Sequence, residues 1–184
     1  MASRSAPQRY IAFLRAVNVG KRQVKMDALR KLFEAMGFGE VETFIASGNV
    51  IFTAPAQDTR ALERRIEGEL KTGLGFEVET FIRTPAELAA ITRYRPFGDD
   101  ADGHTMYVNF VYEPLDTASV ERLEALRTEV DEFRVHGREF YWLARKKISE
   151  SLVTGPMMAK AIGKVPSTNR NITTVQKLAA KYPA

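Results

Sequence analysis

The chain has 184 residues, and its 27 lysines and arginines against 23 aspartates and glutamates leave a net charge of +4. Hydrophobic residues make up 45% of the chain and charged residues 27%, values typical of soluble globular domains, which exclude collagen, a coiled-coil rod and a wholly disordered chain. The absence of cysteine and the presence of only two histidines exclude a disulfide framework, a thiolate nucleophile and a histidine-rich metal cage.

The first part of the chain predicts four strands and two helices in the order β-α-β-β-α-β. Apolar runs favour strands at Tyr10–Val17, Val41–Ala46, Val50–Thr53 and Phe76–Arg83. Apolar residues at helical spacing predict one helix from Lys25 that Gly37 ends, and a second that Asp58 or Thr59 caps. This order is typical of a ferredoxin-like unit, here residues 9–83, whose right-handed crossovers place the strands in the sheet order 4-1-3-2.

The second part, residues 84–184, predicts a related α+β unit that ends in a helix. Thr84 to Glu87 form a capping box with proline at the first helical position. The pattern then predicts the order β-α-β-β, with a helix capped by Thr117 and a hairpin around Gly137-Arg138. Helical or loop material from Ser149 to Ile162 is expected in place of a fourth strand, and a last helix is expected from Thr173.

Polar and basic residues are expected to gather at one end of the first sheet. The first and second strands run the same way with the third between them, so the end of strand one, the turn at 47–49 and the start of the first helix share one edge. We call this surface the rim; its residues are Arg15, Asn18, Gly20, Lys21, Arg22, Lys25, Ser47, Gly48 and Asn49. A helix N-terminus with cations and glycines beside it favours a phosphate or carboxylate site.

Two further observations bear on the rim. Its asparagines could instead satisfy turn backbones while its cations stay solvated, which is the structural alternative. A second polar cluster near the C-terminus, with Arg170, Asn171 and Lys177, would add another wall to the site if the last helix folds back. Gly20-Lys21 lacks the serine or threonine of a phosphate-binding P-loop, and no cofactor is expected.

Several motifs together resemble the bacterial family known only as domain of unknown function 1697. The motifs are Ile11–Gly20, Lys25-Met26 with Leu29, Gly37-Phe38, Ser47–Phe52 and Thr168–Leu178. The resemblance covers nearly the whole chain, and it implies a two-part α+β cytoplasmic protein with no established activity. Its motif positions coincide with the rim and with the C-terminal cluster.

Three functions remain open from the sequence. The first is non-catalytic binding of an anionic ligand, a nucleotide or a nucleic-acid phosphate, at the rim. The second is an enzyme acting on a phosphorylated or carboxylated small molecule, for which Glu34, Glu42 and His104 are the candidate bases. The third is a structural or assembly protein that uses the edges of its sheets. No run of apolar residues is long enough for a membrane helix, so no membrane partner is expected and the cytoplasm is the expected location.

Overall fold

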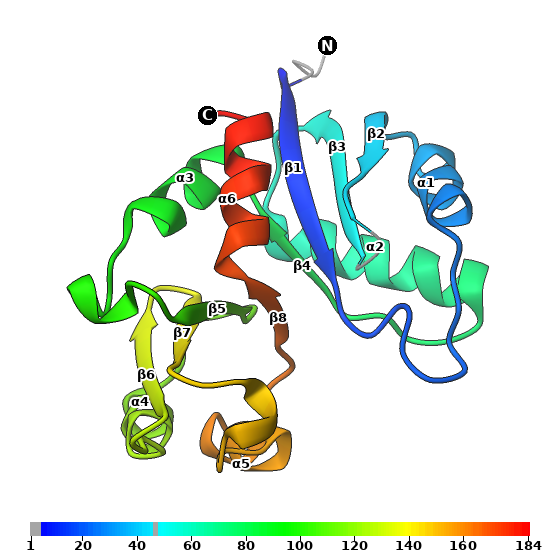
Figure 1. Ribbon diagram of the computed structural model, residues 1–184. Helices are drawn as coiled ribbons and strands as arrows, with labels where there is room; N and C mark the ends of the chain where they lie inside the picture. Colours follow the sequence, from blue (N-terminus) through cyan, green and yellow to red (C-terminus); the bar gives the residue numbers. More distant parts are fainter. Residues whose placement is uncertain (1–4, 46–47) are drawn as a thin grey trace. The chain divides into compact units, whose positions relative to one another are not determined.

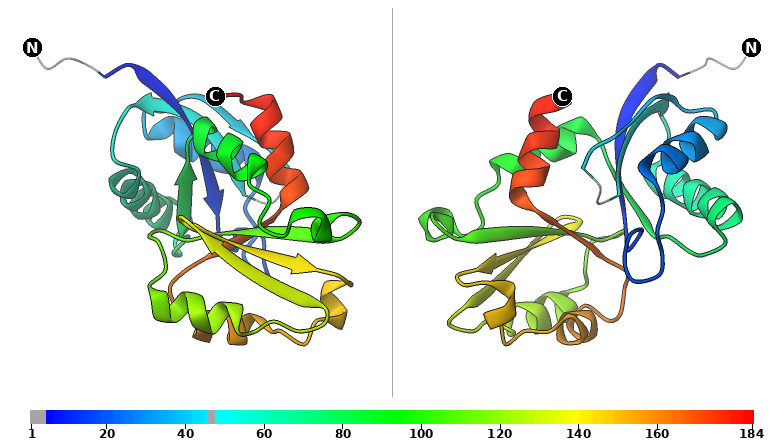
Figure 2. Two further views of the ribbon diagram at one scale, coloured as in Figure 1. Left: turned by 90° about the vertical axis from the view of Figure 1, so that its left-hand side faces the viewer. Right: turned by 45° about the vertical axis from the view of Figure 1, so that its right-hand side comes forward.

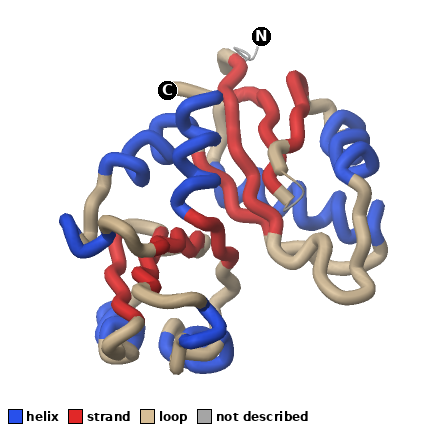
Figure 3. The backbone as a smooth tube through the Cα atoms, in the orientation of Figure 1, coloured by secondary structure: helices blue, strands red, loops and turns tan. Residues whose placement is uncertain are grey.

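The protein is a mixed α+β chain that divides into two compact units. A computed structural model describes residues 5–45 and 48–184. The first unit runs to Ala89 and also takes in Tyr182–Ala184, and the second unit is Ala90–Lys181. Within the described residues each unit contains one four-stranded antiparallel sheet, drawn in red in Figure 3.

The first unit alternates strands and helices as the sequence predicts. Its elements are β1 (Pro7–Leu14), α1 (Met26–Ala35), β2 (Gly39–Thr43), β3 (Asn49–Pro55), α2 (Thr59–Leu74) and β4 (Thr80–Arg83). The sheet order β2-β3-β1-β4 agrees with the predicted order. Helices α1 and α2 cover one face of the sheet, and residues such as Leu29, Phe33 and Ile66 pack there against Phe52 and Ile82 (Figures 1 and 2).

The residues predicted to cap and end the second helix do so, although two strands are shorter than predicted. Asp58 caps α2 by accepting a hydrogen bond of 2.8 Å from the Ala61 backbone N–H, and Gly75 ends the helix with φ of 81°. Strand β1 ends at Leu14, earlier than predicted, because Ala16 has a left-handed φ of 53° that breaks the extended chain. Strand β4 is likewise shorter than predicted and starts at Thr80.

The second unit begins inside α3 and has a sheet of its own. The elements are α3 (Pro85–Arg93), a 3₁₀ turn η1 (Gly98–Ala101), β5 (Thr105–Phe110), α4 (Thr117–Glu124), β6 (Asp131–His136), β7 (Glu139–Ala144), a 3₁₀ turn η2 (Ile148–Glu150), α5 (Gly155–Ala161), β8 (Thr168–Asn171) and α6 (Ile172–Lys181). Helices α4 and α5 cover one face of this sheet (Figure 1), where Leu123 and Ala161 pack with Trp142. The capping box before α3 forms as predicted, with reciprocal bonds between Thr84 and Glu87.

Two sequence predictions for this unit are wrong. The unit does have a fourth strand, β8, which pairs with β5 from Tyr107 opposite Asn171 to Phe110 opposite Thr168. Its four residues are all polar or charged, so the strand lacks the apolar pattern that identifies strands in sequence. Helix α4 is capped by Asp116, whose carboxylate accepts from the Ser119 backbone N–H at 2.7 Å, rather than by Thr117. With β8 included, the strand order β6-β7-β5-β8 repeats that of the first unit.

Candidate functional site

Gly48, directly before β3, lies against the end of β1, and this contact brings two parts of the rim together. The backbone N–H of Leu14 donates to the carbonyl of Gly48 at 2.8 Å. A side chain on Gly48 would place its Cβ 3.0 Å from Cγ2 of Val17, and its φ of 76° is strained for other residues, so both features favour glycine here. Two stretches some thirty residues apart are therefore neighbours, as the strand order predicts. The rim residue Ser47 lies outside the described residues.

The asparagines of the rim bind backbone groups of its turns. The Oδ1 atom of Asn18 accepts a hydrogen bond of 2.8 Å from the backbone N–H of Val24, which closes the loop between β1 and α1. Asn49 is fully buried and donates through Nδ2 to the carbonyl of Phe44 at 2.9 Å. These bonds are the turn interactions of the structural alternative, and they join backbone groups that stand six and five residues from each asparagine.

Four basic residues of the rim are exposed on the loop between β1 and α1. They are Arg15, Lys21, Arg22 and Lys25. Arg15 lies 3.5 Å from the carboxylate of Glu79, and the guanidinium of Arg22 lies over the ring of Phe76 at 4.9 Å. Gly20, with φ of 63°, makes the turn at the tip of the loop.

The loop leads directly into helix α1. Lys25 occupies the N-cap of α1, and its side chain caps no backbone N–H of the first turn. Serine, threonine, aspartate or asparagine usually stands at this position. A lysine there leaves the N-terminal N–H groups of α1 without the usual side-chain acceptor and adds a positive charge to them.

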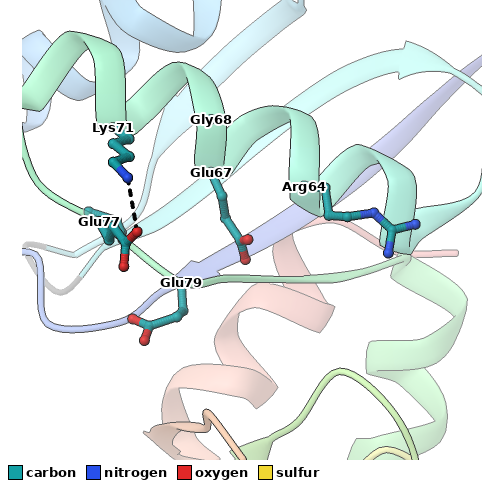
Figure 4. A pocket seen from close by; sticks show the side chains of 7 residues that line it. Arg64, Glu67, Gly68, Lys71, Glu77 and Glu79 are labelled. Carbon is teal, nitrogen blue, oxygen red and sulfur yellow. Dashed lines mark hydrogen bonds and ion pairs between the residues drawn. The ribbon is translucent and has the colours of Figure 1, made fainter.

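A groove of about 310 Å³ has Glu79 in its wall (Figure 4), and Glu79 is also the residue that pairs with Arg15 of the rim. Arg64, Glu67, Gly68 and Lys71 of α2 line one side, and the segment 77–79 lines the other. Lys71 and Glu77 form an ion pair across it at 3.1 Å. The charges of the groove are mixed, with more acidic than basic side chains, whereas the loop carries four exposed basic side chains. The sequence analysis missed this groove because its residues come from two separate segments.

The C-terminal cluster belongs to the second unit. Arg170 is largely buried and donates to the carbonyl of Asn169 at 2.7 Å and to Oγ1 of Thr168 at 2.9 Å, and burial lowers the pKa of its guanidinium to about 10. Asn171 accepts from the backbone N–H of Thr173 at 2.9 Å at the start of α6, and Lys177 is exposed on that helix. The idea that these residues add a wall to the rim stays a prediction.

The candidate bases named from the sequence have other surroundings. Glu34 pairs with Arg30 at 3.3 Å, and Glu42 accepts a hydrogen bond from the hydroxyl of Tyr182. Burial and that bond raise the pKa of Tyr182. His104 lies in the second unit. The carboxylate that does lie at the rim is Glu79, which the sequence analysis did not single out.

Across residues 5–45 and 48–184, no three or more side chains of the metal-ligating types gather in one place. No helix in that part of the chain is both long and apolar enough to cross a membrane.

Comparisons with known proteins identify a family of unknown function and a solved structure with a similar fold. A family model described as "Protein of unknown function (DUF1697)" matches residues 8–141, which confirms the resemblance seen in the motifs. Comparison with curated protein sequences gave no significant match. The conserved bacterial protein SP0830 from Streptococcus pneumoniae has a similar structure, with a TM-score of 0.75 and 24% sequence identity, over 97% of this chain and 100% of that chain. The likeness supports the α+β fold.

Proposed function

The chain belongs to this family of unknown function, and we propose that it binds an anionic ligand, a nucleotide or a nucleic-acid phosphate, at the rim without chemical conversion. The observation that carries the proposal is the loop between β1 and α1. It exposes four basic side chains and leads into a helix whose N-cap is Lys25. Backbone N–H groups, a helix dipole and cations that converge in this way favour phosphate oxygens.

The construction of the loop supports the proposal. Asn18 closes the loop, Gly48 packs under it and Arg22 lies over Phe76. A loop held in one conformation loses less conformational entropy when it binds a ligand, which favours affinity. We assign Asn18, Gly48 and Asn49 to shaping the rim, while Arg15, Lys21 and Lys25 would contact the anion and Gly20 would let it approach the backbone.

The experiment is a titration of a fluorescein-labelled single-stranded oligonucleotide, with ATP and inorganic phosphate as competitors, at several salt concentrations. Binding should weaken as salt rises. The double variant Lys21→Ala/Lys25→Ala should reduce the slope of log affinity against log salt by about 1.4, because each lysine that pairs with a phosphate of a single strand adds about 0.7 to that slope. Lys31→Ala is the matched control, since Lys31 is an exposed lysine further along α1. Equal affinities for the double variant and the control would overturn the proposal.

A second candidate, an enzyme acting on a phosphorylated or carboxylated small molecule, is favoured by one contact. The carboxylate of Glu79 lies 3.5 Å from the guanidinium of Arg15, so an acid–base group stands next to a cation that can hold an anion. Release of phosphate or of an alcohol from a panel of phosphate esters, lost in Glu79→Gln but kept in Glu77→Gln, would establish this function. No turnover of any ester would leave binding as the function.

We also infer finer assignments of fold and location. The shared β-α-β-β-α-β order and the sheet order of both units support a ferredoxin-like arrangement in each. The lack of cysteine supports the reducing cytoplasm as the location of the protein.

A further inference from the structure

A second cavity lies wholly within the second unit, and the proposed function does not involve it, although two of its lining residues, Ile172 and Gln176, belong to the motif Thr168–Leu178. It has a volume of about 380 Å³, and its walls come from the segment 92–106 and from the first turns of α6. This volume falls at the lower end of the range of about 300–1,000 Å³ that small-molecule pockets cover. The cavity is therefore of a size for a small ligand.

Aromatic and apolar side chains form part of the wall. Tyr94 and Phe97 contribute rings, and Met106 and Ile172 contribute flexible and branched apolar groups. Aromatic rings and the methionine sulfur make favourable contacts with the faces and edges of other planar rings. These walls favour a flat, partly apolar ligand.

The aromatic wall is held in place from the sheet of the same unit. The ring of Tyr94 stacks on His136 of β6, with centroids 4.3 Å apart, and contacts Tyr141 of β7 at 5.2 Å. The guanidinium of Arg134, also on β6, lies 5.7 Å from the centre of the Phe97 ring. Because the rings are fixed before a ligand arrives, binding costs little ordering of side chains.

Two polar side chains of the wall are available to a ligand. The imidazole of His104 and the carboxamide of Gln176 make no hydrogen bond to any residue in 5–45 or 48–184. Each of these groups can both donate and accept a hydrogen bond. A ligand that carries donors and acceptors along one edge could pair with both.

The charges at the cavity are nearly balanced. The guanidinium of Arg95 lies 3.4 Å from Asp102 and 3.5 Å from Asp99, and it donates to the carbonyl of Gly98 at 3.2 Å. Among the lining residues, all of them in the described part of the chain, the carboxylate of Asp102 therefore offsets the guanidinium of Arg95, and Asp99 adds a second carboxylate outside the lining. This balance distinguishes the cavity from the rim, where cations predominate, and it favours a neutral ligand over an anion.

We propose that this cavity binds a neutral heteroaromatic ring with hydrogen-bond donors and acceptors on its edge, of the nucleobase or nucleoside class. The ring lies along Tyr94 and Phe97, and its polar edge meets His104 and Gln176. The site is separate from the rim and does not depend on the function proposed there.

Proton NMR of the two histidine rings tests the proposal directly. His104 and His136 are the only histidines, and the variant His104→Gln assigns their signals. Adenosine, guanosine, cytidine and uridine serve as probes, titrated up to their solubility, with inorganic phosphate as a separate arm. At least one nucleoside should shift the His104 signals in a saturable manner, and phosphate should not.

Two variants define the site. Gln176→Ala should weaken binding of the responding nucleoside by about fivefold, as expected for the loss of one hydrogen bond. Lys181→Ala changes an exposed residue at the end of α6, which does not line the cavity, and should leave affinity unchanged. The proposal is overturned if no nucleoside moves the His104 signals, or if both variants bind equally well. The rim variant Lys21→Ala/Lys25→Ala should bind the nucleoside normally, so failure here and failure of the anion site remain distinguishable.

Discussion

The buried carboxylate of Glu63 accepts a hydrogen bond of 3.1 Å from the backbone N–H of Ile82, on the outer side of the edge strand β4. One turn further along α2, Glu67 accepts from the N–H of Thr80 at 3.0 Å. Arg60 lies within 4.0 Å of both carboxylates. Helix α2 thus covers an edge that would otherwise expose unpaired donors, which is one way that proteins prevent unwanted strand pairing.

Glu63→Ala should lower the free energy of unfolding by about 1–3 kcal/mol, because the N–H of Ile82 loses its acceptor in a buried position. Glu63→Gln keeps an acceptor oxygen and should cost less. Urea unfolding followed by far-UV circular dichroism measures both. Glu69→Ala, on the exposed side of α2, is the control and should change stability by no more than about 0.5 kcal/mol. A Glu63→Ala protein as stable as this control would contradict the role of the bond.

Periodicity predicted the apolar side of α2 but not this polar contact. Leu62, Ile66 and Leu70 stand at helical spacing and are buried as expected. Glu63 and Glu67 also stand at helical spacing, next to that apolar stripe, yet the same pattern occurs on many solvated helix faces. Only the position of β4 decides that these carboxylates meet backbone donors, and sequence spacing alone does not contain that position.

Gly48→Ala should destabilise the first unit more than Gly20→Ala. Both glycines have positive φ, 76° and 63°, so an L-residue costs about 1–2 kcal/mol at either position. A Cβ at Gly48 would also lie 3.0 Å from Val17, whereas no atom lies within 4 Å of one at Gly20. The extra crowding should add about 1–3 kcal/mol to the loss in unfolding free energy, which urea unfolding of both variants measures. Equal losses for the two variants would mean that the turn and β1 are not in contact.

The carboxylate of Asp131 joins the hairpin to the segment before α5. It accepts from Nε1 of Trp142 at 2.8 Å, from Oγ of Ser151 at 2.9 Å and from Oγ1 of Thr128 at 3.0 Å. Asp131→Ala should cost at least about 2 kcal/mol, since it leaves a buried indole N–H without an acceptor. Trp142 is the only tryptophan, so its fluorescence during urea unfolding reports on this unit. Asp100→Ala, at an exposed site, should unfold like the parent protein.

Strand β8 shows where the local sequence pattern fails to predict secondary structure. Thr168–Asn171 has the side chains of a turn or cap, and Asn171 does begin the last helix. The same residues become β8 because β5 offers them an unpaired edge, a tertiary effect that overrides local propensity. At the rim, by contrast, the strand order predicted the contact: Gly48 was expected at the end of β1, and its carbonyl accepts from the backbone N–H of Leu14 there.

Stability at acidic pH should depend on the contact between Glu132 and Arg145. Nη2 of Arg145 lies 2.6 Å from Oε2 of Glu132. This hydrogen bond, together with the positive charge of Arg134, lowers the pKa of Glu132 below its ordinary value of 4.5. A carboxyl with a lower pKa in the folded state stabilises the fold fully above its unfolded pKa, and this stabilisation is lost as pH falls through the folded value. Arg145→Ala should therefore cost about 1.5–3 kcal/mol at pH 7 and progressively less below about pH 4.5.

Urea unfolding of the parent and of Arg145→Ala at a series of pH values measures this dependence. Lys146→Ala removes a neighbouring exposed cation and serves as the control, with a small and pH-independent effect. A penalty for Arg145→Ala that stays constant between pH 7 and pH 3 would show that the interaction with the charged form of Glu132 does not stabilise the fold.

Two variants of Asn18 distinguish the effect of the loop's backbone hydrogen bond from the effect of the rim's charge. Its Oδ1 atom holds the backbone N–H of Val24 at 2.8 Å, in a loop that carries the basic residues of the rim. Asn18→Ala removes the acceptor and should lower the unfolding free energy by about 1 kcal/mol.

Asn18→Asp keeps an acceptor oxygen, so its loss of stability should be smaller, but it adds a negative charge among cations that would meet the anion. The aspartate variant should be the more stable of the two, and if the rim binds phosphate it should bind the labelled oligonucleotide more weakly than Asn18→Ala, with this difference in binding shrinking as salt rises. Melting temperatures and anisotropy titrations on the same samples test this order, and an aspartate variant that binds as tightly as the parent would remove the rim from consideration as an anion site.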